Sequence, residues 1–275
     1  MTLSTNMQKA MPMIKDSPVD LVQLYSDFIR AKNDENRKNR YEGQEHWYHA
    51  SGAGSCSRKL YFESVVKQEP TNPIKDAGMR LLRLGTILHD DLGEALTMYN
   101  TMYNNTMYNK EKERNKEKES NLKFHVEKEI TIDSLNVRGF YDVVAEDGKV
   151  YLYDLKSCAS YSWTMKFGRK KKFDPSIYYE LQLGTYGYAI EKEFGRLDGM
   201  YLLYYNKDNS KMKYVEVPLT FVSRAFLFWR NINDEHKQGL PMFKKGVSPV
   251  QPWNCSYCQF LDVCNPPNKE GIKRK

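Results

Sequence analysis

The sequence has little of what a secreted or membrane protein needs. Residues 1–20 contain no apolar core of a secretory signal. The longest apolar run, around Met200–Tyr205, is far shorter than the roughly 20 residues of a membrane-spanning helix. No G-x4-G-K-[ST] phosphate-binding loop occurs either, which argues against a helicase or ATPase motor. We therefore expect a cytoplasmic protein without membrane partners.

Cysteine is also scarce, and its number is odd. Five cysteines without a signal peptide argue against a disulfide framework and favour metal binding in a reducing compartment. The 275 residues are 40% hydrophobic and 28% charged, a composition typical of a folded globular chain. Twenty tyrosines and twelve phenylalanines suit base stacking, but they suit an ordinary core equally well.

The net charge of +7 is concentrated in two places. One is a run within 166–172 and the other is the tail 269–275. A localised basic face favours a polyanionic partner, while a solvated loop and a frayed tail are the simpler alternative. The basic residues of the first run are Lys166, Arg169, Lys170, Lys171 and Lys172.

Hydrophobic periodicity predicts a mixed α/β chain. We expect a single domain over 1–275, with an N-terminal helical or loop region (1–55), a core (56–240) and a cysteine-rich segment with a basic tail (241–275). Residues 97–119, a TMYN repeat followed by KEKERNKEKE, are a low-complexity insertion expected to form an exposed loop or a frayed helix extension. Helices are expected over 17–32, 57–66, 78–96, 176–194 and 219–236, and strands over 122–132, 137–145, 150–155, 200–205 and 213–217.

Two carboxylates and a lysine stand close together between residues 139 and 156. Residues two apart on a strand share a face, so Asp154 and Lys156 are expected to project together while Leu155 points into the core. Asp142 lies one short hairpin earlier. Carboxylates bind hard cations and a lysine stabilises developing charge, as hydrolysis of a phosphodiester requires. The simpler alternative is a pair of surface acids, one of them paired with Lys156.

Three further residues flank this group in the sequence. His89 lies on a helix before the strands, where a lone histidine is usually structural. Gln182 and Tyr186 are four residues apart on the helix that follows, so they share one helix face. Their amide and phenol can project together toward a phosphate, although Tyr186 also suits the core and Gln182 the surface.

The cysteines form a second pattern. Cys255, Cys258 and Cys264 give C-x2-C-x5-C, and Cys56 stands about 200 residues earlier. Four thiolates hold either tetrahedral zinc or a 4Fe–4S cluster, and the spacing alone does not separate them. A chance C-x2-C with two distant thiols is the simplest alternative. Cys158 is left over and is expected to behave as a small hydrophobic residue.

From Cys56 to Cys264, the order of these motifs resembles the RecB-like branch of the PD-(D/E)xK nuclease superfamily. The resemblance implies a restriction-endonuclease-like α/β core, a mixed sheet flanked by helices, with N-terminal helices and a C-terminal cysteine-rich iron–sulfur appendage. It also implies a Mg²⁺ or Mn²⁺ site. The implied metal ligands are His89, Asp142, Asp154 and the Leu155 carbonyl; the implied catalytic residues are Asp142, Asp154, Lys156, Gln182 and Tyr186.

One cysteine before the nuclease motifs and three after them is the layout of the iron–sulfur members of that branch, which include CRISPR-associated enzymes and phage exonucleases. This resemblance favours a 4Fe–4S cluster over zinc. It implies a DNA exonuclease acting on single-stranded ends, with 5′→3′ polarity favoured, in DNA recombination, repair, replication or CRISPR adaptation and alongside the proteins of those processes. A phage origin would place it in the host cytoplasm.

The basic run follows the lysine strand, so it is expected to track a DNA backbone while Tyr161 and Trp163 stack on bases. The alternative is a non-catalytic DNA-binding module with a structural zinc site.

Overall fold

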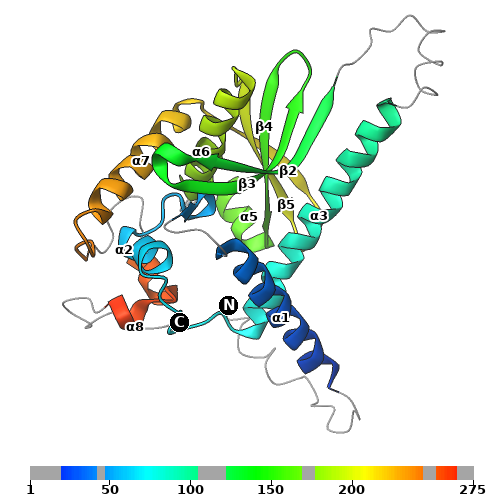
Figure 1. Ribbon diagram of the computed structural model, residues 1–275. Coiled ribbons are helices and arrows are strands. Elements are labelled where there is room, and N and C mark those ends of the chain that lie inside the picture. The colour runs from blue at the N-terminus through cyan, green and yellow to red at the C-terminus, as the bar shows by residue number, and fades with distance from the viewer. Residues whose placement is uncertain (1–19, 42–46, 105–121, 169–176, 244–251, 265–275) are drawn as a thin grey trace, which may run out of the picture.

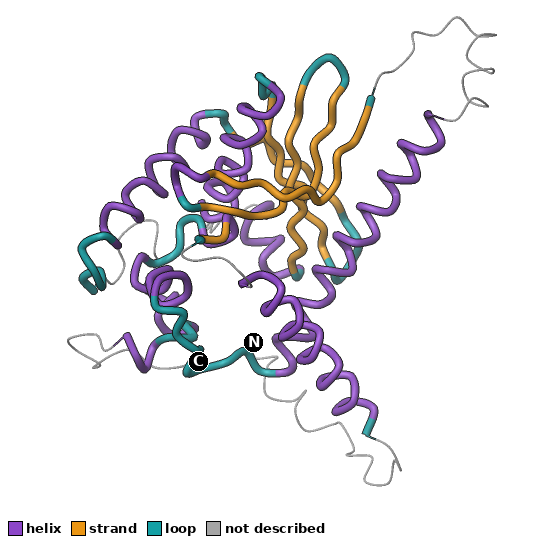
Figure 2. Tube along the Cα trace, in the orientation of Figure 1, coloured by secondary structure: helices purple, strands orange, loops and turns teal. Residues whose placement is uncertain are grey.

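The computed structural model describes residues 20–41, 47–104, 122–168, 177–243 and 252–264. A mixed six-stranded sheet lies between two groups of helices (Figures 1 and 2). Helix α3 covers one face of the sheet and carries α1 on it, and the α6–α7 pair covers the other face.

The longer helices are α1 (Leu21–Tyr41), α3 (Asp76–Asn104), α6 (Ile177–Phe194) and α7 (Thr220–His236). The shorter ones are α2 (Ser57–Leu60), α5 (Ser160–Phe167) and α8 (Leu261–Cys264), with the π-helix η3 (Tyr61–Val65) and the 3-10 turns η2 (Ala50–Gly52), η4 (Asp133–Leu135) and η5 (Pro252–Tyr257). The strands are β1 (Tyr48–His49), β2 (Lys123–Ile132), β3 (Val137–Glu146), β4 (Val150–Cys158), β5 (Gly199–Asn206) and β6 (Met212–Val217).

Strand order is β1-β3-β4-β5-β6, with β2 pairing β3. The β3–β4 hairpin is antiparallel, but its ladder runs only from Glu146↔Val150 to Val143↔Tyr153. Beyond Val143 the short β1 pairs with the far end of β3 instead, in parallel. The β4–β5 pair is also parallel, and α6 lies on the connection between these two strands. The β3–β4 ladder therefore ends directly before Asp142, and space opens between the two strands there.

The main core lies between the sheet and the α6–α7 pair. Trp229 is fully buried there, and its indole N–H donates to Thr185 Oγ1 over 2.9 Å. Gly184 permits the close contact of the two helices, because a Cβ at this position would lie 2.2 Å from the Phe221 carbonyl oxygen. This close packing fixes α6 against the sheet, and α6 carries Gln182 and Tyr186.

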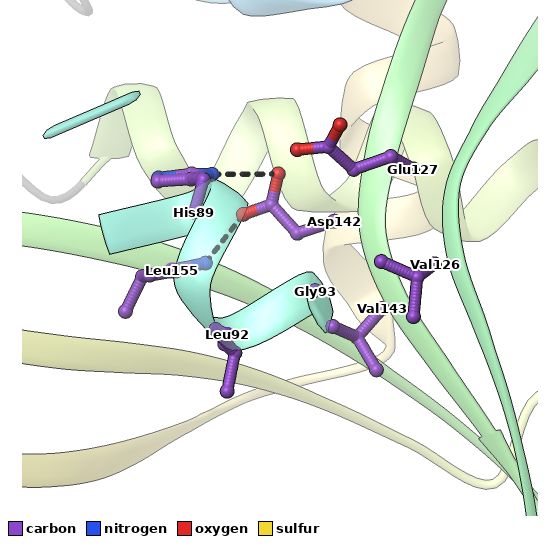
Figure 3. Close-up of a pocket in the computed structure, with 8 residues that line it drawn as sticks. All are labelled: His89, Leu92, Gly93, Val126, Glu127, Asp142, Val143 and Leu155. Carbon is purple, nitrogen blue, oxygen red and sulfur yellow. Dashed lines mark hydrogen bonds and ion pairs between the residues drawn. The ribbon is translucent and has the colours of Figure 1, made fainter. Parts of the chain in front are cut away.

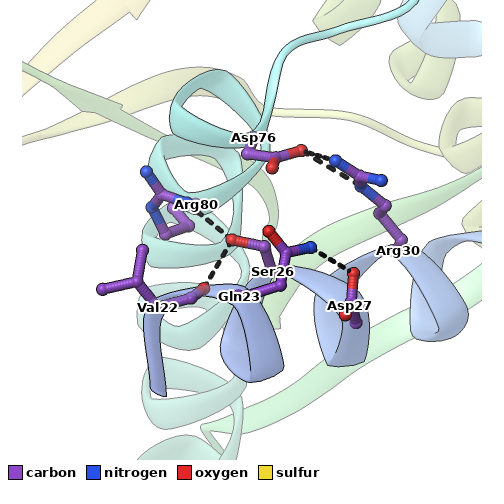
Figure 4. Close-up of polar contacts among 7 residues, drawn as sticks. All are labelled: Val22, Gln23, Ser26, Asp27, Arg30, Asp76 and Arg80. Atoms are coloured by element: carbon purple, nitrogen blue, oxygen red, sulfur yellow. Dashed lines mark hydrogen bonds and ion pairs between the residues drawn. The ribbon is translucent and has the colours of Figure 1, made fainter. Parts of the chain in front are cut away.

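Helix α1 is attached to α3 through polar side chains (Figure 4). The Arg30 guanidinium donates to Asp76 at the start of α3. One turn further along α3, Arg80 donates to Ser26 Oγ over 2.7 Å, and Ser26 in turn donates to the Val22 carbonyl. These bonds hold α1 across the face of α3.

The expected elements are present, but some of their ends differ: the helix expected over 17–32 continues to Tyr41, and the one expected over 57–66 is divided into α2 and η3. Helix α3 begins two residues before the expected start and continues into the repeat as far as Asn104. Asn100 attaches the first copy of the repeat to β2. Its side-chain oxygen accepts from the Phe124 N–H over 2.9 Å, and its amide nitrogen donates to the Phe124 carbonyl over 2.7 Å. Residues 105–119 of the insertion lie outside the described residues.

One further element differs from the sequence expectations. Residues 160–167 form the helix α5, where only a strand end followed by a basic run was expected. In the described part of the chain, no helix is both long enough and apolar enough to cross a bilayer.

Candidate active site

Asp154 and Lys156 lie side by side on β4, as the two-residue period of a strand predicts. The Asp154 side chain is 1% exposed, and its Oδ2 lies 2.6 Å from Lys156 Nζ. Apart from this ion pair, neither Asp154 oxygen has a hydrogen bond of normal geometry within the described residues. A fully buried carboxylate with one counter-charge and unused lone pairs is costly unless another cation joins it.

Asp142 reaches the same place from β3, where the two strands separate. Its Oδ2 accepts a 2.6 Å hydrogen bond from the Leu155 backbone N–H. Its Oδ1 lies 3.3 Å from His89 Nδ1, which α3 brings in from the opposite side (Figure 3). The helix approaches closely here, because a Cβ on Gly85 would lie only 3.2 Å from Ser157 Oγ. We call the group His89, Asp142, Asp154 and Lys156 the acid site.

The charges of the acid site depend on one another. Burial raises the pKa of Asp154 to about 6, although the neighbouring Lys156 acts to lower it. Burial acts to lower the pKa of Lys156, but Asp154 and Asp142 outweigh it and the pKa is raised. The pKa of His89 is raised in the same way, because Asp142 outweighs burial. The carboxylates around Lys156 and His89 therefore favour the charged form of each.

Gln182 and Tyr186 extend the acid site along α6. Lys156 Nζ donates to Gln182 Oε1 over 3.1 Å, and Gln182 Nε2 donates to Tyr186 Oη over 3.2 Å. The Tyr186 side chain is buried, and Gly139 of β3 lies against its ring. The expected common face of the amide and the phenol is confirmed, and this chain of bonds orients the lysine.

The donor set of the acid site fits a hard divalent cation. It provides two carboxylates and an imidazole, and the Asp154 oxygens have no other described partner than Lys156. In the described residues, no three His, Cys, Asp or Glu side chains stand close enough together to coordinate one ion without some movement. The part of the Leu155 carbonyl as a ligand stays a prediction.

Sequence reasoning missed one residue of this region. Glu127 of β2 lines the same small pocket as His89, Asp142 and Leu155. The proximity of Glu127 to Asp142 can be recognised only once strands β2 and β3 are aligned, because the two residues are 15 positions apart in the sequence.

The thiols of Cys56 and Cys264 act electrostatically on that of Cys258, and Cys255 precedes Cys258 by one turn, with its carbonyl accepting from the Cys258 N–H. We call Cys56, Cys255, Cys258 and Cys264 the cysteine site. Burial raises the pKa of the Cys258 thiol, and the nearby Cys56 and Cys264 thiols raise it further. The Phe260 N–H donates to Cys258 Sγ over 3.4 Å, and Arg58 Nε donates to Cys264 Sγ over 3.3 Å. Cys56 from the N-terminal half thus lies beside cysteines of the C-terminal segment.

The residues expected to contact DNA differ in their surroundings. Tyr161 is 76% exposed on α5, whereas Trp163 is partly buried and packs on Phe167 with a 4.6 Å centroid distance. Lys166 Nζ lies 5.0 Å from the ring centre of Tyr204. The other four basic residues of the run, Arg169, Lys170, Lys171 and Lys172, lie outside the described residues.

Two carboxylates and a lysine lie on β3 and β4, where these strands of a mixed sheet diverge. This arrangement is typical of nucleases that hydrolyse phosphodiesters with the help of a metal. Residues 94–265, more than half of the chain, match the PD-(D/E)XK nuclease superfamily. The chain belongs to this superfamily, and membership implies metal-dependent nuclease activity. His89 and Cys56 lie before the matched segment.

Comparison with solved structures shows the same fold. Twenty-three chains match. One of them, the crystal structure of SSO0001, aligns with 88% of this chain and 96% of that chain at a TM-score of 0.50 and 18% sequence identity. A comparison with curated proteins found no match.

Proposed function

We propose that the protein is a metal-dependent deoxyribonuclease that degrades single-stranded DNA from its ends, with 5′→3′ polarity favoured. The observation that carries this proposal is the Asp154 carboxylate, which is fully buried, paired with Lys156 and without other described partners. Such a group is expected at a cation site, because its desolvation is otherwise poorly compensated. Its neighbours Asp142 and His89 supply further ligands of the right type.

The acid site would hold Mg²⁺ or Mn²⁺ through His89, Asp142 and Asp154, and the histidine makes Mn²⁺ as suitable as Mg²⁺. When bound, the cation polarises the scissile phosphate and lowers the pKa of water. Lys156, held by Asp154 and Gln182, orients the attacking water and offsets charge that develops on the phosphate. Tyr186 acts indirectly, by fixing the orientation of Gln182.

The surroundings of Lys156 support a polyanionic substrate. Lys156 Nζ lies 5.0 Å from the ring centre of Tyr179, and this ring lies 6.5 Å from that of Tyr204, beside Lys166. Two lysines and two tyrosines therefore follow one another from the acid site toward α5. Tyr204 is buried, whereas Tyr179 is 37% exposed. A strand of DNA on this path would therefore meet cationic charge and the ring of Tyr179, a combination used to bind single strands.

The test uses the purified chain with end-labelled linear and circular single-stranded DNA in Mg²⁺ or Mn²⁺. The linear strand should shorten from its 5′ end while the circle stays intact. Asp154→Asn should lower the rate on the order of 10³-fold or more while DNA binding persists, because a cation ligand and the counter-charge of Lys156 are lost together. Asp147→Asn, an exposed acid in the β3–β4 turn, is the matched control and should cleave normally. Normal cleavage by Asp154→Asn would overturn the site assignment.

We also propose that the cysteine site holds a 4Fe–4S cluster with a structural role. The proximity of the Cys56, Cys258 and Cys264 thiols supports it, as does the loop that their joining would close. Protein purified without oxygen should absorb near ~400 nm and contain about four irons per chain. A colourless protein with zinc would replace the cluster by a zinc site. Zinc together with salt-sensitive DNA binding and no cation-dependent cleavage would favour the non-catalytic DNA-binding module.

A further inference from the structure

We infer that Glu127 is an additional ligand of the divalent cation at the acid site. This inference rests on the metal centre of the proposed function and adds a residue from a third strand. It follows from strand register, backbone conformation, the facing side chains and the distribution of cationic partners.

Glu127 stands directly opposite Asp142 across the β2–β3 ladder. The pairs on either side are Val126↔Val143 and Lys128↔Tyr141, so the register places Glu127 opposite Asp142 with no residue inserted. Directly opposed residues of antiparallel strands have Cβ atoms roughly 4.5–5.5 Å apart, and like charges at this position destabilise the sheet. The fold therefore brings two carboxylates together at the point where the sheet opens toward His89.

The backbone departs from strand geometry at this one pair. Glu127 has φ = 46°, in the left-handed region that non-glycine residues rarely adopt, while its neighbours on both sides remain in the ladder. A conformation of this kind costs of order 1–3 kcal/mol and persists where the surroundings require it. In this conformation the side chain of Glu127 lines the pocket together with those of His89 and Asp142.

The side chains of the pocket face one another. Figure 3 shows the carboxylate of Glu127 directed toward Asp142, next to the edge of His89 that approaches Asp142 Oδ1. All three residues line this pocket. Burial raises the pKa of Glu127 and Asp142 raises it further, as expected for two facing carboxylates. An imidazole nitrogen and two carboxylates are suitable ligand types for Mn²⁺ or Mg²⁺. Within the described residues they are not yet arranged to hold an ion, so coordination requires the side chain of Glu127 to move.

The nearby lysines do not neutralise Glu127. Lys128 Nζ lies 3.1 Å from His125 Nδ1, and Lys156 Nζ is paired with Asp154. Within the described parts of the chain, no lysine or arginine forms an ion pair with Glu127. His89 lies beside Asp142 and acts electrostatically on Glu127, so it offsets part of their charge. A bound cation would supply the further positive charge that two facing carboxylates favour. The long and exposed side chain of Glu127 can complete the coordination by rotating.

The test measures cation binding as well as cleavage. Mn²⁺ is titrated into the metal-free, full-length protein by calorimetry, and free Mn²⁺ is followed by electron paramagnetic resonance. Glu127→Gln should raise the Kd for Mn²⁺ by about 10-fold or more, as expected when one ligand is lost. DNA cleavage should fall by a similar factor at limiting Mn²⁺ and recover at saturating Mn²⁺. Glu127→Asp should lie between this variant and the wild type.

Glu129→Gln is the matched control, because Glu129 is also an exposed glutamate on β2 but lies opposite Phe140. Its Kd for Mn²⁺ should stay within twofold of the wild type. A Kd within twofold for Glu127→Gln, or an equal weakening by Glu129→Gln, would overturn the inference. Thermal unfolding of the metal-free Glu127→Gln protein should be unchanged or occur at higher temperature, because a like-charge contact is removed.

The two proposals can fail separately. If the wild type binds Mn²⁺ in a Glu127-dependent way but cleaves no DNA, the proposed function is wrong and Glu127 remains a ligand. If the wild type cleaves DNA and Glu127→Gln binds Mn²⁺ normally, the function stands and the ligand assignment is wrong.

Discussion

The acid site is built on two adjacent strands of one sheet, with His89 added from α3, whereas the cysteine site is assembled from short elements far apart in the sequence. Asp142, Asp154 and Lys156 are placed by adjacent strands, and α6 packs over them. The cysteines lie instead near the short elements α2, η5 and α8. Side-chain and backbone bonds connect these elements over more than 180 residues of sequence.

This difference changes what each site depends on. Loss of one side chain in the acid site leaves the sheet and its hydrogen bonds in place, so the main consequence is chemical. The cysteine site is held by few contacts: Phe260 stacks on Phe62 at 5.9 Å, and the Thr71 and Asn72 N–H groups donate to the Gln259 carbonyl. Segments with few buried contacts open locally at low free energy. Substitutions in the cysteine site should therefore first cause local unfolding of its segments.

The largest expected effect is at Lys156. Lys156→Met keeps the length of the side chain and removes its charge, which leaves the Asp154 carboxylate buried without its counter-ion. DNA cleavage should fall roughly 10²–10³-fold. The metal-free protein should lose about 3 kcal/mol or more of unfolding free energy, measured by denaturant titration.

The same variant tests whether the acid site is pre-formed. Added Mn²⁺ should stabilise Lys156→Met more than the wild type, because the cation then supplies the missing positive charge. Lys192→Met at the end of α6 is the control and should change neither cleavage nor stability. Equal stabilisation of both proteins by Mn²⁺ would contradict a cation bound beside Asp154.

The second effect is at Arg58, which links the two ends of the chain. Its guanidinium donates to the Pro241 carbonyl and to the Cys264 carbonyl, each over 2.6 Å, and to Cys264 Sγ. Arg58→Met should cost on the order of 2 kcal/mol, because charge-assisted hydrogen bonds to backbone carbonyls are lost. Lys59→Met, one residue on, should cost much less.

The region destabilised by Arg58→Met is more informative than the size of the loss of unfolding free energy. Hydrogen exchange of residues 252–264 should accelerate in Arg58→Met, whereas the amides of β3 and β4 should exchange as in the wild type. A uniform acceleration across the sheet would show that the cysteine site and the core unfold together, and the distinction between the two regions would be lost.

The difference between the acid site and the cysteine site also explains which features could be predicted from the sequence. Asp154 and Lys156 were placed correctly by the two-residue period of a strand, and Gln182 and Tyr186 by helical spacing. These are local rules. Glu127 was missed because its relation to Asp142 depends on the register of β2 against β3, which the sequence pattern does not specify beyond the alternation of each strand.

Other elements were missed for related reasons. Helix α5 has no side-chain cap at Ala159, so no start signal marks it, although Gly168 directly after its last residue is a typical stop signal. The extension of α3 through the repeat depends on the bonds of Asn100 to Phe124, a contact with a strand more than 20 residues away. The geometry of the cysteine site likewise depends on long-range contacts.

The smallest expected effect concerns His236, at the seam between α7 and α2. Its Nδ1 lies 2.7 Å from Tyr48 Oη, and its Nε2 lies 3.0 Å from the Ser57 carbonyl. The Tyr61 ring packs on the imidazole edge to face, and Glu235 acts on it electrostatically. Burial lowers the pKa of His236. The neutral form, which accepts from Tyr48 and donates to Ser57, is therefore favoured by the fold.

Because the folded-state pKa is lower than the unfolded value of about 6.5, unfolding takes up a proton below that pH. The stabilisation by neutral His236 is present above pH 6.5 and is lost as the pH falls toward the folded-state pKa, by at most about 1.4 kcal/mol per pH unit. His236→Gln keeps one donor and one acceptor but does not titrate. In denaturant titrations, the free-energy difference between wild type and variant should shrink between pH 7.5 and 5.5. Using this difference removes the opposite contribution of Asp154, which is common to both proteins. A free-energy difference that stays constant with pH would show that protonation of His236 does not affect the contact between α7 and α2.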